Sequence, residues 1–373
     1  GASREKAYKH AMQAAREAKA AAGQMEAATM ADLALRSSRG QAERLPALSL
    51  LAEAELESAQ LPRAKEHLDE ILRLDPDMPA EQRVEVKLKL VRATSGEANW
   101  NDASRILADV QLDIRGIPNP EPRVEARLEV LNWRLKAATR GNDVPEADRI
   151  KNRIEWIRTA AEKAGHLTEA GFATASCSTA AFELFYGSAC KGLELLSSLR
   201  IGAGWPEHLV HRIRLLRGLG YQRLGSWDRS EYELRQSYSL AQKTNDTLQI
   251  AAVLTNLACT AVERGSWDEA EEYGRAASTL HGALSTALDV LIPLRLNVAN
   301  LAFYQGNVRE AYKLYLGVYE HATSCDYTEF KTEVEACLGL AALQLRDSSA
   351  ARRWIEECDT REATLVGMQE RFK

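Results

Sequence analysis

Two short arrangements in this sequence could support chemistry, and both are incomplete. Ser188 and Lys191 match the Ser-x-x-Lys pattern of an activated serine, but the companion motifs of such enzymes are missing and the pair falls where a helix is expected to begin. His208 and His211 could share one helix face as metal ligands, but a third ligand at useful spacing is missing and Arg212 adds positive charge beside them. Neither arrangement predicts a reaction.

Nucleotide-binding patterns are also missing. The sequence has no Gly-x-x-x-x-Gly-Lys-Ser/Thr loop, and the glycines at 218, 220 and 225 are spaced wrongly for a dinucleotide-binding loop. We therefore expect a protein that is not an enzyme, with no catalytic residues, no metal site and no cofactor.

Composition narrows the classes of partner. The 373 residues carry 48 basic and 53 acidic side chains, a net charge of −5, which disfavours direct binding of nucleic acid. No run of about eighteen apolar residues occurs, so no transmembrane helix is predicted. Six cysteines are scattered without a regular spacing, which is typical of reduced thiols in the cytoplasm.

The strongest signal is an internal repeat of about forty residues. Gly225–Asp228 (Gly-Ser-Trp-Asp) recurs as Gly265–Asp268, and the same repeat position reads Gly306–Arg309 one unit later. A small residue follows each of these turns. Counting the weaker copies upstream and downstream, such anchors fall at positions 64, 103, 147, about 189, 230, 270, 311 and 351.

Each repeat unit predicts two antiparallel helices. Between 248 and 279, apolar residues recur at three- and four-residue steps, Gly265 is placed to cap the first helix, and Asp268 and Glu269 suit the start of the second. We therefore expect an all-α, right-handed superhelical solenoid of about eight hairpins with terminal caps. Its expected parts are an N-terminal hairpin over 1–40, the repeat array over 41–360 and a C-terminal capping helix over 361–373.

This pattern resembles the tetratricopeptide repeat (TPR). Leu254, Leu257 and Ala258 with Gly265 and Ala270 fit its template well, whereas the stretch 145–199 fits poorly. The ordinary TPR unit has 34 residues, so the forty-residue form resembles kinesin light chain repeats and the sensor domains of MalT-like signal-transduction ATPases and transcription activators. That resemblance, and a start without Met, imply a piece of a larger protein.

The resemblance also implies a binding surface. In TPR proteins the first helix of each hairpin lines a concave groove, and asparagines there bond the backbone of a peptide. A complete cationic clamp for a terminal carboxylate is not evident. In an alternative interpretation the asparagines cap or bridge helices within the array. The candidate partner-binding residues are Arg212, Gln222, Asn256, Asn297, Asn300, Phe303 and Tyr304.

We expect a non-enzymatic, cytoplasmic scaffold for protein–protein interaction, which binds a peptide or partner helix in its concave groove. The alternative function is ligand sensing within a multidomain signal-transduction ATPase or transcription regulator. In that case a small-molecule effector joins proteins and peptides as a partner. Neither nucleic acid nor membrane is expected to bind this chain directly.

Overall fold

The computed structural model describes residues 2–141, 143–202, 204–280, 287–324 and 328–359. These residues form α-helices joined by short turns, with one 3-10 turn (Ile114–Gly116) and no β-strand among them. The helices are α1 (Ala2–Ala20), α2 (Gln24–Ser37), α3 (Gln41–Glu57), α4 (Leu61–Leu74), α5 (Ala80–Gly96), α6 (Trp100–Asp113), α7 (Pro120–Arg140), α8 (Val144–Lys163), α9 (Glu169–Tyr186), α10 (Ala189–Ser198), α11 (Glu207–Arg223), α12 (Trp227–Thr244), α13 (Thr247–Glu263), α14 (Trp267–Thr279), α15 (Leu288–Tyr304), α16 (Val308–Ser324), α17 (Thr328–Gln344) and α18 (Ser348–Asp359).

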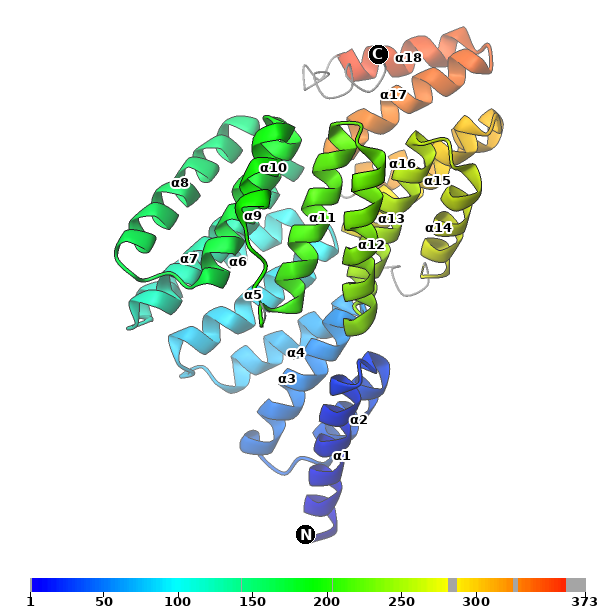
Figure 1. Cartoon of the computed structure of the whole chain (residues 1–373). Helices are drawn as coiled ribbons and strands as arrows, with labels where there is room; N and C mark the ends of the chain where they lie inside the picture. Colours follow the sequence, from blue (N-terminus) through cyan, green and yellow to red (C-terminus); the bar gives the residue numbers. More distant parts are fainter. Residues whose placement is uncertain (1, 142, 203, 281–286, 325–327, 360–373) are drawn as a thin grey trace.

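Consecutive helices pair into nine hairpins within the described residues (Figure 1). The fourth residue of almost every second helix from α4 onwards is a small, fully buried side chain, which lets the two helices of a hairpin approach closely. This confirms the all-α solenoid that the forty-residue spacing predicts. These small residues are Ala64, Ala103, Ala147, Ser230, Ala270, Ala311 and Ala351.

One anchor is displaced from its expected place near residue 189. In α10 the fourth residue is Gly192, and a Cβ there would lie 2.8 Å from Leu184 Cδ2 and 3.0 Å from the carbonyl oxygen of Ala180. Only glycine fits so close a crossing, whereas Ala189 is the first residue of α10. In this hairpin a glycine therefore takes the position that a small residue with a Cβ holds in the other hairpins, because α9 and α10 lie closer together.

Most of the turns within the hairpins contain a residue in the left-handed backbone conformation. Gly225, Gly265 and Gly306 have φ of 66°, 76° and 84°, which confirms the expected helix cap at Gly265. Four other hairpins hold the same conformation without glycine, at a cost of about 1–2 kcal/mol each. These residues are Ala22, Ala59, Ala98 and Arg346, with φ of 58°, 61°, 59° and 60°.

The first helices of the hairpins form an inner layer. From α5 to α17, each odd-numbered helix contacts the next odd-numbered helix, whereas the second helices pack mainly on first helices. The array also returns on itself, because α5 contacts α15 and α7 contacts α17, each five hairpins further along (Figure 1). The inner surface is therefore enclosed by a nearly complete turn of the superhelix.

Polar and apolar contacts close this turn. Arg92 Nη2 on α5 lies 2.9 Å from Oδ2 of Asp246, which is buried at the start of α13. Nearby, the side-chain amide of Asn245 donates to the carbonyl of Ala22 at 2.9 Å. We call this contact between the two ends of the turn the seam.

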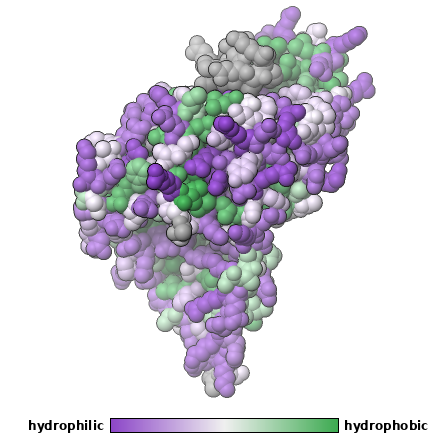
Figure 2. Space-filling view, viewed as in Figure 1, coloured by the Kyte–Doolittle hydropathy of each residue, from purple (hydrophilic) through white to green (hydrophobic). Residues whose placement is uncertain are grey.

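The visible outer face is mostly hydrophilic, with scattered apolar patches (Figure 2). In the ranges given above, no helix is both long enough and apolar enough to cross a membrane. The expected C-terminal cap over 361–373 lies outside the described residues.

Candidate functional site

The candidate binding residues lie on three consecutive first helices, α11, α13 and α15. Their side chains are partly buried, except that of Tyr304, which is 51% exposed. The structure divides them into two groups that differ in their hydrogen-bond partners.

The first group surrounds Arg212 in the middle of the solenoid. Arg212 Nη2 donates to Asn132 Oδ1 on α7 at 2.7 Å and to Ser178 Oγ on α9 at 3.4 Å. Ser178 Oγ itself donates to Asn132 Oδ1 at 2.7 Å. Three first helices thus meet through their side chains, and both hydrogen-bond partners of the guanidinium are uncharged.

Glu129 lies one turn before Asn132 on α7, beside this group. Its side chain is reached by solvent, but the surrounding helices raise the pKa of its carboxyl by burial. Arg212 and a hydrogen bond from Trp133 lower this pKa, whereas the charges of Glu85 and Glu125 raise it further. The central cluster, as we call Glu129, Asn132, Ser178 and Arg212, therefore combines a fixed positive charge with a carboxyl whose pKa is raised above its ordinary value.

The second group is the carboxyl-terminal row: Gln222, Asn256, Asn297 and Asn300. Gln222 Nε2 donates to the carbonyl of Asn256 at 3.0 Å and to Thr260 Oγ1 at 2.7 Å, so it joins α11 to α13. Asn297 Nδ2 donates to the carbonyl of Thr255 at 3.2 Å, so it joins α15 to α13.

Asn256 differs from its neighbours in the row. Its Nδ2 donates to the carbonyl of Ala252, one turn earlier in the same helix, at 2.7 Å. This hydrogen bond links no other helix. Asn256 is therefore a member of the row whose amide nitrogen does not join two helices.

Asn300 is part of the packing at the end of α15. Its Oδ1 accepts from the hydroxyl of Tyr315, which is 2% exposed and whose pKa is raised by burial. The Phe303 ring lies 6.5 Å from the Tyr315 ring. Tyr304 lies at the hairpin turn instead, 6.3 Å from the Trp267 ring. The Phe303 and Tyr304 rings also meet edge-on, with their centroids 5.9 Å apart, so the aromatic residues form one chain of contacts from Tyr315 to Trp267.

Three members of the central cluster were not predicted from the sequence. Glu129, Asn132 and Ser178 lie on α7 and α9, in or beside the stretch where the repeat pattern is weakest, so no repeat position marked them. The available signal was the presence of hydroxyl residues inside the apolar helix α9, where Ser176 and Ser178 are buried.

In the described part of the chain, no group of three His, Cys, Asp or Glu side chains that could hold a metal ion gathers around the histidine pair. His211 is buried, and its Nδ1 lies 3.0 Å from Ser237 Oγ. Burial lowers the pKa of both His208 and His211, which keeps both rings neutral near pH 7.

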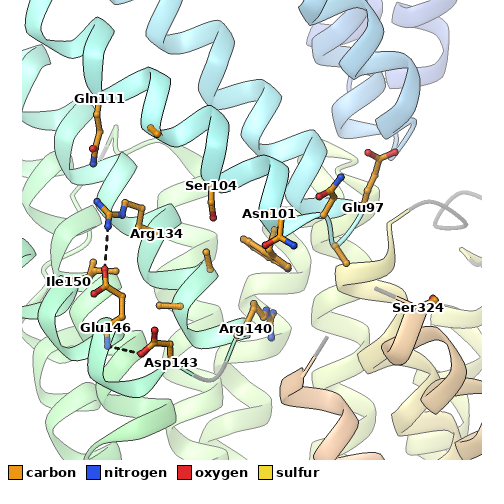
Figure 3. Close-up of a pocket in the computed structure, with 17 residues that line it drawn as sticks. Glu97, Asn101, Ser104, Gln111, Arg134, Arg140, Asp143, Glu146, Ile150 and Ser324 are labelled. Atoms are coloured by element: carbon orange, nitrogen blue, oxygen red, sulfur yellow. Dashed lines mark hydrogen bonds and ion pairs between the residues drawn. The ribbon is translucent and has the colours of Figure 1, made fainter. Parts of the chain in front are cut away.

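A separate cavity of about 950 Å³ lies between α6 on one side and α7 and α8 on the other (Figure 3). Arg134 of α7 lies 3.2 Å from Glu146 of α8, and the Asp143 carboxylate accepts from the Glu146 backbone N–H at 3.0 Å. Ser324, at the end of α16, is also part of the lining. The cavity thus joins residues from hairpins four or five units apart in the array, and its lining includes none of the candidate binding residues.

Residues 210–281 match the family model described as tetratricopeptide repeat. A search of curated protein sequences returns no significant match. Among solved structures, a Rap protein complexed with Competence and Sporulation Factor shares the fold over 99% of this chain and 100% of that chain, with a TM-score of 0.61 and 11% identity.

Two further structures match at lower TM-scores. The apo quorum sensor NprR from B. thuringiensis has a TM-score of 0.47 and 12% identity, over 95% of this chain and 99% of that one. A signal transduction ATPase with numerous domains and a tetratricopeptide repeat sensor, from Pyrococcus horikoshii, has a TM-score of 0.41 and 15% identity, over 92% of this chain and 54% of that one.

The forty-residue hairpins, the left-handed turns and the family match agree with one another. This chain therefore has the fold of a solenoid of TPR-like helical hairpins, and residues 210–281 within it match the tetratricopeptide-repeat model.

Proposed function

We propose that this chain binds a peptide segment of a partner protein on its inner surface, with Arg212 and Asn256 as the principal contacts. The observation that carries the proposal is the set of hydrogen bonds that the Arg212 side chain forms. Its guanidinium bonds uncharged groups, so its positive charge is free to bind a carbonyl or carboxylate oxygen of a ligand. The complex of a Rap protein of the same fold with Competence and Sporulation Factor supports a binding role.

Asn256 supplies a complementary contact about 40 residues along the array. An amide side chain offers both a donor and an acceptor, as a peptide backbone does. Because the Asn256 amide nitrogen bonds only within its own helix, it can exchange that bond for a ligand without separating α13 from its neighbours. Gln222, Asn297 and Asn300 serve mainly to hold the inner layer together.

The proposal includes a cytoplasmic location. The six cysteines of the sequence lack the regular spacing of a disulfide framework, which suits a reducing compartment. Non-enzymatic binding, without a cofactor, is the activity we propose for this surface.

The test is selection of peptides from a phage-displayed library on the immobilised chain, followed by fluorescence anisotropy with a selected peptide. We expect Arg212→Ala to weaken binding by at least about tenfold, or 1.4 kcal/mol. The matched control is Arg105→Ala, because Arg105 is exposed on α6 and pairs with Asp102. Failure to select any peptide, or equal affinity of Arg212→Ala and the unmodified chain, would overturn the proposal.

A further inference from the structure

The cavity beside α6 is an opening between two hairpins that follow each other in the array (Figure 3). Asn101, Ser104 and Gln111 lie three and seven residues apart, so they share one face of α6, and all three are exposed there. Across the described residues, their side chains form no hydrogen bond. One wall of the cavity is therefore a row of uncharged donors and acceptors.

The opposite wall is made of small residues and charges that already have partners. Ala137 and Ala138 of α7 leave space where larger side chains would close the gap. Glu146 lies 3.2 Å from Arg134 and 3.0 Å from Arg149. A charged ligand would have to compete with these existing pairs, so the wall favours an uncharged one.

Charged residues of the turns at one end of the cavity also have neighbours that interact with their charges. Glu97 lies 3.9 Å from the Lys65 ammonium, and the Arg140 guanidinium lies 5.8 Å from the centre of the Phe330 ring. Glu97 and Arg140 thus have an opposite charge or an aromatic face nearby, whereas Asp143 accepts from the Glu146 backbone N–H.

We propose that this cavity binds a neutral, hydroxyl-rich small molecule, a polyol or a sugar of one or two rings. Each hydroxyl group both donates and accepts, as the side chains of Asn101, Ser104 and Gln111 do. The volume of about 950 Å³ is within the range of small-molecule pockets. The site is separate from the inner surface, so it goes beyond peptide binding.

The position of the cavity gives the ligand a second effect. Its lining includes Ser324 of α16 together with residues of α6, α7 and α8, which come from hairpins four or five units earlier. A molecule in the cavity contacts hairpins from both ends of the superhelical turn and favours the closed turn. This arrangement would make the chain responsive to a small molecule.

Direct binding tests the proposal, because sugars also stabilise proteins by exclusion from their surface. Isothermal titration calorimetry of the full chain would use glucose, sucrose and myo-inositol, with glucuronate and glucosamine as charged analogues. We expect saturable binding of at least one neutral probe to a single site, and weaker binding of its charged counterpart.

A pair of tryptophan variants places the site. Ser104→Trp fills the cavity from an exposed position of α6, whereas Asp109→Trp adds the same side chain on the opposite face of the helix. We expect Ser104→Trp to weaken binding by about tenfold or more, and Asp109→Trp to have no effect. Circular dichroism checks that both variants are folded.

The results for ligand binding in the cavity can be distinguished from the results for peptide binding on the inner surface. Arg212→Ala must leave binding of the neutral probe unchanged, whatever it does to peptide binding. No saturable binding of any neutral probe, tighter binding of the charged analogues, or equal binding by Ser104→Trp and the unmodified chain would each overturn the inference.

Discussion

In the middle of the solenoid, Arg212 reaches from α11 to Asn132 and Ser178, side chain to side chain. In the carboxyl-terminal row, Gln222 and Asn297 donate to backbone carbonyls of α13, and Gln222 also donates to the Thr260 hydroxyl. Bonds between side chains can rearrange around a ligand, whereas bonds to the backbone of a neighbouring helix fix the spacing of the helices. We therefore propose that Arg212 in the central cluster contributes to binding, and that Gln222 and Asn297 in the carboxyl-terminal row contribute mainly to packing.

The largest effect is expected in the central cluster. Replacing Arg212 by Ala removes the charge that would contact the ligand, and we expect a loss of about 2 kcal/mol in peptide affinity, or about thirtyfold. Fluorescence anisotropy with a selected peptide measures it. Arg212→Lys keeps the charge but loses the fork of donors, so it should bind with intermediate affinity. Equal affinity of all three proteins would remove the distinction between the two regions.

The next largest effect concerns stability in the carboxyl-terminal row. Asn300→Ala leaves the buried hydroxyl of Tyr315 without its acceptor, which should cost about 1–3 kcal/mol of unfolding free energy in urea. Adding Tyr315→Phe removes the orphaned hydroxyl and should recover most of the loss. If Asn300→Ala alone is as stable as the unmodified chain, this residue does not serve packing.

A third effect depends on pH and concerns the central cluster, because its stability contribution changes with the ionisation of the Glu129 carboxyl. Burial raises the pKa of Glu129 in the folded chain above its value near 4.3 in the unfolded chain. The native state then binds the proton more tightly, so this residue lowers stability as pH rises through that interval. We expect Glu129→Gln to be more stable than the unmodified chain at pH 7, with the difference vanishing below about pH 4.

Urea unfolding at pH 4 and pH 7 measures this difference. Glu121→Gln is the control, because Glu121 is exposed in the first turn of α7 and its stabilising interaction there is with the helix dipole. A Glu129→Gln variant that is less stable than the unmodified chain at pH 7 would show that the carboxylate is stabilised and not strained.

The sequence predicted the architecture well because one repeat unit determines the others. Small residues such as Ala64 and Ala270 must occur wherever two helices cross closely, so their period reveals the hairpins. The anchor near 189 was displaced to Gly192, because a glycine allows a crossing that alanine would block.

The candidate site was only partly predictable. Arg212 and Asn256 occupy first-helix positions of regular units, where the template applies. Asn132 comes from a 21-residue helix outside the regular spacing, and its contact with α11 skips a hairpin. The seam depends on the pitch of the whole superhelix, so no local pattern could place Arg92 beside Asp246.

The most direct test compares Asn256→Ala with Asn297→Ala, because these asparagines hold equivalent positions in successive hairpins. Peptide affinity and urea unfolding would be measured for both variants. Our account predicts that Asn256→Ala weakens peptide binding by about tenfold with less than about 0.5 kcal/mol change in stability, whereas Asn297→Ala costs about 1 kcal/mol of stability and leaves affinity nearly unchanged. The reverse result, in which Asn297→Ala loses affinity and Asn256→Ala loses stability, would contradict it.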